Sequence, residues 1–177
     1  MKSSAKNDFI MPICVLTIIC LVITALLALT NSATQSVIEN ASRERAEAAR
    51  AEIISEAEGF ELMEVEGLPD SVEEVYRTTN DCGYVFMLST MGYGGEMKLI
   101  LGMDNDGKII SVKTLEHSET KGMGSKTTEE PFRSQFVGKD ENLEGVDMVS
   151  GATISSTAYL EAVRDAFEAY NIVTEVK

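Results

Sequence analysis

The sequence predicts an α+β domain with a largely antiparallel sheet and flanking helices, preceded by one transmembrane helix and a helical stalk. Three observations predict this class. Residues 9–31 carry no charge and are mostly aliphatic. Two apolar runs flank the turn Asp104-Asn105-Asp106-Gly107, which is a strong hairpin signal. The last segment repeats apolar side chains at intervals of three and four residues, as an amphipathic helix does.

Residues 9–31 form the predicted transmembrane helix, because about 20 apolar residues span the hydrocarbon core of a bilayer. A cleaved secretory signal is the alternative, but its apolar region is usually about 7–15 residues long. Lys2 and Lys6 precede the span, whereas residues 32–42 contain no Lys or Arg. The positive-inside rule therefore places residues 1–8 in the cytoplasm and the large C-terminal part outside, in a single-pass protein of the cell membrane.

Residues 32–59 are predicted to be a helical stalk that leads to a domain over residues 60–177. The helix is expected from about residue 33 to residue 58, since Ala and Glu dominate and no Gly or Pro interrupts before Gly59. Its apolar stripe is thin, and Arg and Glu occupy the other faces. This pattern favours a solvated helix over a coiled coil.

The domain is expected to contain four elements besides the hairpin. Residues 83–90 are rich in aromatic and aliphatic side chains and predict a strand, which the flexible stretch MGYGG follows. Residues 128–137 predict a short helix with Phe132 and Phe136 on one face. Residues 146–149 are interpreted as a short strand. The final helix carries the apolar series Tyr159, Leu160, Val163, Phe167 and Tyr170.

Charge and cysteine content exclude several classes of function. The chain has 15 Lys and Arg against 29 Asp and Glu, and residues 32–177 carry a formal charge of about −15. Nucleic acid requires a basic face, so no nucleic-acid partner is expected. Cys14 and Cys20 fall inside the apolar span and leave Cys82 alone in the soluble part. An internal disulfide or a cysteine-based metal site is therefore excluded there, and no metal is expected.

Two stretches are neither ordinary core nor ordinary surface. The first is LEHSETKGMGSK, residues 115–126, which holds the single histidine, His117, with Glu119 and Thr120 close behind. A histidine beside an acid could act as a general acid–base pair, but a hydrogen-bonded loop histidine is the more common case. The pattern contains neither a nucleophile elbow nor enough ligands for zinc.

The second stretch is DMVSGATISSTAYLEAV, residues 147–163, where small residues precede the final helix. Backbone N–H groups and the helix dipole make such an end favourable to anions, and Ser150 and Thr153 add hydroxyl groups. By local physics alone, a hydroxyl that caps the helix is favoured over a phosphate site. The stretch is not a P-loop, because no G-K-[ST] sequence follows.

These stretches carry a resemblance to a known family. Residues 147–153 match D-x-x-[ST]-G-A-T, and HSETKGMG is similar to H-x-E-T-P-G-x-G, with Lys121 where that pattern usually has proline. Both patterns are typical of proteins that carry flavin mononucleotide (FMN) covalently. With its single N-terminal span, the chain resembles the RnfG subunits of the Rnf ion-translocating electron-transport complex, which are related to the longer NqrC subunits. The motifs cover roughly residues 80–165.

The resemblance implies a covalent FMN cofactor and a set of site residues. The Thr153 hydroxyl would join the FMN phosphate in a phosphoester, installed by a separate flavin transferase. Asp147 would belong to the transferase's recognition sequence, and Ser150, Gly151 and Ala152 would let the phosphate approach closely. The flavin ring would lie near the loop of His117, Glu119 and Thr120, and the flavin itself would carry the redox chemistry.

The implied function is electron relay by a membrane-anchored flavoprotein subunit of an Rnf-type ferredoxin:NAD oxidoreductase coupled to ion transport. Such a subunit would work with other membrane subunits and would have no substrate site of its own. Two alternatives remain open at the level of sequence. One is a stand-alone flavinylated carrier outside the cytoplasm. The other is a non-redox, membrane-anchored binding module in which the SGAT turn only caps a helix.

Overall fold

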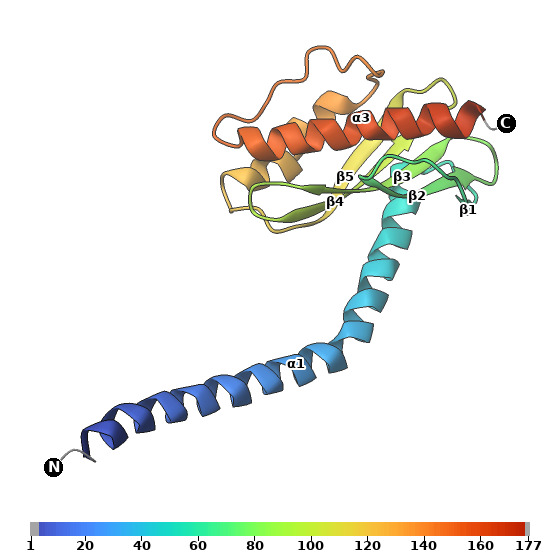
Figure 1. The fold of residues 1–177 in the computed structure, drawn as a ribbon. Helices are drawn as coiled ribbons and strands as arrows, with labels where there is room; N and C mark the ends of the chain where they lie inside the picture. The colour runs from blue at the N-terminus through green and yellow to red at the C-terminus, as the bar shows by residue number, and fades with distance from the viewer. Residues whose placement is uncertain (1–3, 176–177) are drawn as a thin grey trace. The chain divides into compact units, whose positions relative to one another are not determined.

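The computed structural model describes residues 4–175, except for the side chains of residues 4–9 and 39. It contains a long N-terminal helix, a five-stranded antiparallel sheet in the order β1-β2-β3-β4-β5, and a C-terminal helix (Figure 1), so the predicted α+β class is confirmed. The elements are α1 Ser4–Ile53, β1 Phe60–Met63, β2 Val72–Thr78, β3 Tyr84–Met91, β4 Glu96–Met103, β5 Ile109–His117, η1 Gly124–Thr128, α2 Glu130–Arg133, η2 Ser134–Phe136 and α3 Thr153–Glu175.

Helix α1 is long and apolar enough to cross a membrane. Its side chains from residue 10 to residue 38 are exposed, as expected for a surface that faces lipid. The threonine hydroxyls do not remain unpaired there, because Thr17, Thr24 and Thr30 each donate to the carbonyl four residues earlier at 2.7–2.9 Å. The bilayer core contains no water to bind polar groups, so each of them has to form its hydrogen bonds within the protein.

The last turns of α1 pack on the sheet. Ala49, Ile53 and Ile54 are buried with Val85 and neighbouring residues of β3 and β4. The sequence predicts a solvated helix as far as residue 58, whereas the structure ends α1 at Ile53 and buries its end. The thin apolar stripe of Ala and Ile thus covers the centre of one face of the sheet, and each fully buried aliphatic side chain contributes about 1.5–3 kcal/mol.

The other face of the sheet carries α3, which lies across it (Figure 1). Strand β3 shows the division most clearly, because Phe86 and Leu88 belong to the α3 side while Val85 belongs to the α1 side. Alternation of this kind follows from the two-residue period of a strand. The predicted strand over residues 83–90, the hairpin at residues 104–107 and the final helix are confirmed.

Phe132 and Phe136 lie on one face, as predicted, and both contact Tyr159 of α3. The ring centroids of Phe132 and Tyr159 are 5.3 Å apart, and those of Phe136 and Tyr159 are 5.4 Å apart. The predicted helix over residues 128–137 is divided into the short segments η1, α2 and η2. This aromatic cluster holds those segments against α3 close to its N-terminal end.

The predicted strand over residues 146–149 is wrong. The Asp147 N–H donates to Gln135 Oε1 at 2.8 Å, and the Val149 N–H donates to Ser156 Oγ at 3.1 Å. Side chains therefore satisfy backbone groups that a strand would pair with a neighbouring strand. A short apolar run cannot reveal this difference, because its own composition is the same in both cases.

Tyr159→Phe should reduce the loss of stability in alkali. Tyr159 is fully buried, and burial raises the pKa of its phenol above the ordinary value of about 10. The unfolded chain then ionises first, so this tyrosine's contribution is intact below about pH 10 and is lost as the pH rises further. Circular dichroism in denaturant should show a shallower alkaline decline for the variant. Equal declines in both proteins would contradict the assignment.

Candidate functional site

The N-terminal end of α3 presents three free backbone donors. The helix begins at Thr153, and the carbonyl of Ala152 accepts the first helical bond, from the Ser156 N–H at 2.9 Å. In the described part of the chain, the N–H groups of Thr153, Ile154 and Ser155 have no acceptor. Alanine at the capping position has no side-chain oxygen to offer them. This end of the helix is therefore suited to an anion.

The hydroxyl groups around this end divide into two kinds. Ser155 and Ser156 are buried, and their oxygens accept from the N–H groups of Tyr93 (3.4 Å) and Val149 (3.1 Å). Ser150 and Thr153 are exposed, and neither hydroxyl has a hydrogen-bond partner among residues 4–175. The alternative in which one of these hydroxyls caps the helix is not supported, because Ala152 occupies the capping position.

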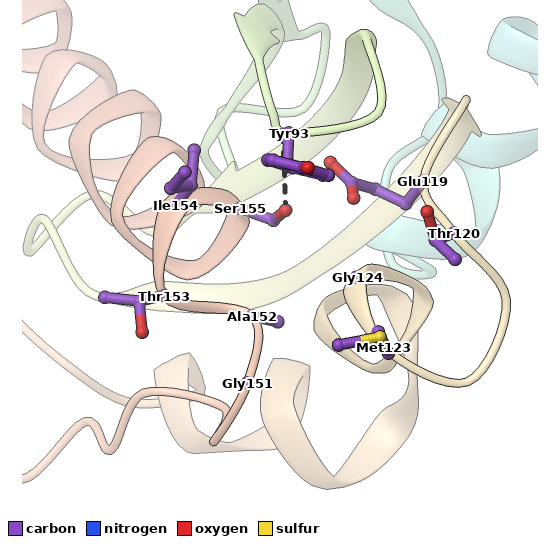
Figure 2. Close-up of a pocket in the computed structure, with 10 residues that line it drawn as sticks. All are labelled: Tyr93, Glu119, Thr120, Met123, Gly124, Gly151, Ala152, Thr153, Ile154 and Ser155. Atoms are coloured by element: carbon purple, nitrogen blue, oxygen red, sulfur yellow. Dashed lines mark hydrogen bonds between the residues drawn. The ribbon is translucent and has the colours of Figure 1, made fainter.

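A cavity of about 410 Å³ borders the start of α3. Three segments that are distant in sequence meet there (Figure 2): the loop between β3 and β4, the loop from β5 into η1, and the turn into α3. Its volume lies in the range of small-molecule sites. The lining residues are Tyr93, Glu119, Thr120, Met123, Gly124, Gly151, Ala152, Thr153, Ile154 and Ser155.

The cavity combines a polar end with an apolar rim. The free donors and the Thr153 hydroxyl stand at the polar end, while Tyr93, Met123 and Ile154 are more than half exposed around it. Exposed aromatic, thioether and branched aliphatic side chains offer contact surface to a flat ring. The residues present therefore fit a ligand with a phosphate at one end and a planar heterocycle at the other.

The turn before α3 requires its glycine. Gly151 has φ +81°, a left-handed conformation that side-chain-bearing residues rarely adopt. The Ala152 N–H donates to the Val149 carbonyl at 3.0 Å, which closes the turn on itself. This geometry brings Thr153 to the surface and buries Ala152 beneath it.

The structure brings together five of the predicted site residues and leaves out three. Thr153, Gly151, Ala152, Glu119 and Thr120 all line the cavity. Three others do not line it, namely Ser150, His117 and Asp147. The exposed His117 borders a second cavity, which Glu119 also lines, and its Nδ1 accepts from the Glu119 N–H at 3.2 Å. Asp147 is exposed in the next groove along, and its backbone is held by both polar atoms of the Gln135 amide.

Comparison with known proteins agrees with this geometry. The model of the FMN-binding domain family matches residues 92–168, a range that contains every residue lining the cavity. The chain is 33% identical over 180 residues to the G subunit of the ion-translocating oxidoreductase complex of Methanosarcina acetivorans, and the alignment covers 93% of this chain and 96% of that protein. The chain belongs to the RnfG family.

Two further relatives carry more specific names. The G subunit of the Na(+)-translocating ferredoxin:NAD(+) oxidoreductase complex of Acetobacterium woodii is 28% identical over 184 residues, or 88% of each chain. The G subunit of the proton-translocating ferredoxin:NAD(+) oxidoreductase complex of Clostridium ljungdahlii is 35% identical over 95 residues, 48% of this chain and 51% of that protein. The chain carries an apolar helix long enough to cross a membrane and is a membrane-anchored member of the RnfG family.

Several lining residues are absent from the sequence prediction. Tyr93 stands between glycines in MGYGG, a stretch whose sequence indicates only a flexible break. An aromatic residue flanked by glycines, next to a hairpin, is the signal that could have pointed to it. Met123 and Ile154 carry no such signal, because exposed apolar residues are common on any protein surface.

Proposed function

We propose that the chain carries FMN in a phosphoester on Thr153 and relays electrons within a ferredoxin:NAD oxidoreductase complex coupled to ion transport. One observation carries this proposal. The unbonded Thr153 hydroxyl stands beside three free N–H groups at the mouth of a cavity with an apolar rim. The family match to an FMN-binding domain over the same residues supports FMN as the ligand.

The attachment step balances as a phosphoryl transfer. The Thr153 hydroxyl loses its proton, and its oxygen bonds to the phosphorus of an activated flavin phosphate, whose leaving group departs. A flavin dinucleotide, which would release its nucleotide half, is the class of donor that fits. The net gain is one FMN less one water. The free N–H groups of α3 would stabilise the phosphate charge throughout.

Other residues in and near the cavity have supporting parts in this proposal. Gly151 and the buried Ala152 leave the Thr153 oxygen accessible to a separate flavin transferase. The exposed Asp147 would be recognised by that transferase, and its fixed backbone supports such a role. Tyr93 and Met123 would hold the ring. When bound, FMN supplies one- and two-electron chemistry.

The names of the relatives support a place for this chain in a membrane complex. Those proteins are subunits of ion-translocating or ferredoxin:NAD(+) oxidoreductase complexes. We therefore propose that the partners are other membrane subunits of an Rnf-type complex. The two lysines before the apolar span and the lack of basic residues just after it support a cytoplasmic N-terminus and an extracytoplasmic FMN domain.

Intact mass measurement tests the proposed attachment. The full-length chain is produced in membranes with and without a co-expressed flavin transferase, and is then purified in detergent. We expect a gain of one FMN less one water and flavin fluorescence in a denaturing gel, both only with the transferase. A colourless protein of unchanged mass in both preparations would overturn the proposal.

A further inference from the structure

Glu119 is a buried carboxylate at the edge of the cavity. Its residue exposure is 8%, and it is the one acidic residue among the buried polar residues that the structure describes. It follows β5 and enters the space between the Tyr93 loop and η1, where Figure 2 shows its carboxylate beside Tyr93. A buried charge is costly unless something binds it, so its position calls for a partner.

Glycines make room for this carboxylate. A Cβ atom on Gly92 would overlap Oε1, and one on Gly124 would overlap Oε2. A Cβ on Gly94 would overlap the carbonyl of Ser118, the residue before Glu119. Neither Gly92 nor Gly124 has a positive φ, so close approach rather than backbone conformation explains these two glycines.

The two oxygens of Glu119 have different surroundings. Oε1 accepts from the Gly94 N–H at 3.2 Å. Oε2 is buried and has no hydrogen-bond partner among the described residues. An ionised carboxylate only accepts, so Oε2 is satisfied by a donor group. The open side of Oε2 therefore suits an N–H or O–H group of a ligand in the cavity.

We propose that Glu119 Oε2 accepts a hydrogen bond from the imide N3–H of the FMN ring. This inference rests on the proposed function, and it assigns the orientation of the ring. Oxidised isoalloxazine has a single ring N–H, at N3, and its other polar ring atoms are acceptors. On the ring, a carboxylate that needs a donor therefore selects the pyrimidine edge. The ribityl hydroxyls are the other donors of FMN, and a bond from one of them would leave N3–H exchange unchanged in a Glu119 variant. Glu119 is a positioning residue for the cofactor.

The Glu119→Gln variant distinguishes an ionised Glu119, which accepts from N3–H, from a protonated Glu119, which would donate to a ring carbonyl. The amide oxygen should remain on the Gly94 N–H, because the flipped amide would face that donor with another donor. The NH₂ group then replaces Oε2 and points a donor at N3–H. A carboxyl that was protonated and donated to a ring carbonyl would be mimicked by Gln instead. Loss of the interaction therefore identifies the ionised acceptor.

The test measures hydrogen exchange at N3–H in the full-length chain loaded with ¹⁵N-labelled FMN. We expect N3–H to exchange about 10- to 100-fold faster in Glu119→Gln than in wild type, as loss of a hydrogen bond to a charged group implies. Gly124→Ala should have the same effect without changing any charge, since its methyl group would displace Oε2. Glu129→Gln, at an exposed acid that borders the neighbouring cavity, is the matched control.

The outcomes distinguish the two proposals. Intact mass identifies the fraction of each variant that carries FMN on Thr153, and N3–H exchange is compared in that fraction. If either variant carries FMN and exchanges N3–H as slowly as wild type, the assignment of Glu119 is overturned while the attachment stands. If wild type itself gains no FMN, the proposed function fails and this inference fails with it.

Discussion

Replacing Thr153 by Ala should abolish the covalent gain of FMN completely. The exposed hydroxyl is the atom that we propose to bond to phosphorus, and alanine has no oxygen at this position. The helix should survive the change, since alanine is the best helix former and Thr153 Oγ1 makes no hydrogen bond within residues 4–175. Intact mass and in-gel flavin fluorescence after co-expression with the transferase measure the result.

Three matched variants make this result specific. Thr153→Ser keeps a hydroxyl at the same position and should retain attachment. Ser150→Ala removes an exposed hydroxyl three residues earlier, and Thr157→Ala removes a hydroxyl one helical turn later; both should still gain one FMN. A Thr153→Ala protein that carries the same added mass as wild type would show that the ester lies elsewhere.

Ile53→Ala should lower the free energy of unfolding by about 2–5 kcal/mol, which is the usual cost of truncating a buried isoleucine. Ile53 is 4% exposed at the end of α1 and packs against β4. The loss should appear in chemical denaturation of the full-length chain in detergent, followed by circular dichroism. An effect below about 0.5 kcal/mol, as for a surface substitution, would mean that the end of α1 does not stabilise the sheet.

Gly102 offers a compensating change for this variant. A Cβ atom on Gly102 would overlap Ile53 Cγ2, so Gly102→Ala alone should destabilise the domain by about 1–3 kcal/mol through overpacking. Combined with Ile53→Ala, the added methyl enters the space that the isoleucine leaves. The double variant should therefore be more stable than the sum of the two single effects. Simple additivity would contradict direct contact between these residues.

Local patterns in the sequence predict the middle and the end of the domain well. The hairpin turn at residues 104–107 and the apolar spacing of α3 are properties of contiguous residues, and both are confirmed. The D-x-x-[ST]-G-A-T match indicates Thr153 and Gly151, which lie together in the cavity. Such features are predictable because the interactions that cause them connect residues close in sequence.

Other features depend on contacts between distant residues and could not be predicted in this way. Strand β2 does not alternate cleanly, because a register shift between Val72 and Glu74 interrupts the two-residue period. The separation of His117 from the cavity follows from the direction in which the chain leaves β5, since the backbone turns so that Glu119 faces inward. Tyr93 reaches the site only because β3 and β4 pair in register.

The two-sided packing of the sheet bears on how small a working fragment of this protein can be. The region that matches the FMN-binding domain family begins at residue 92, which is C-terminal to β1, β2 and β3. A fragment cut there would lose Phe86 and Leu88 from beneath α3, and one cut at residue 60 would uncover the opposite face. The compact unit that contains the sheet begins at Arg45, so we expect a stable soluble truncation to require the last turns of α1.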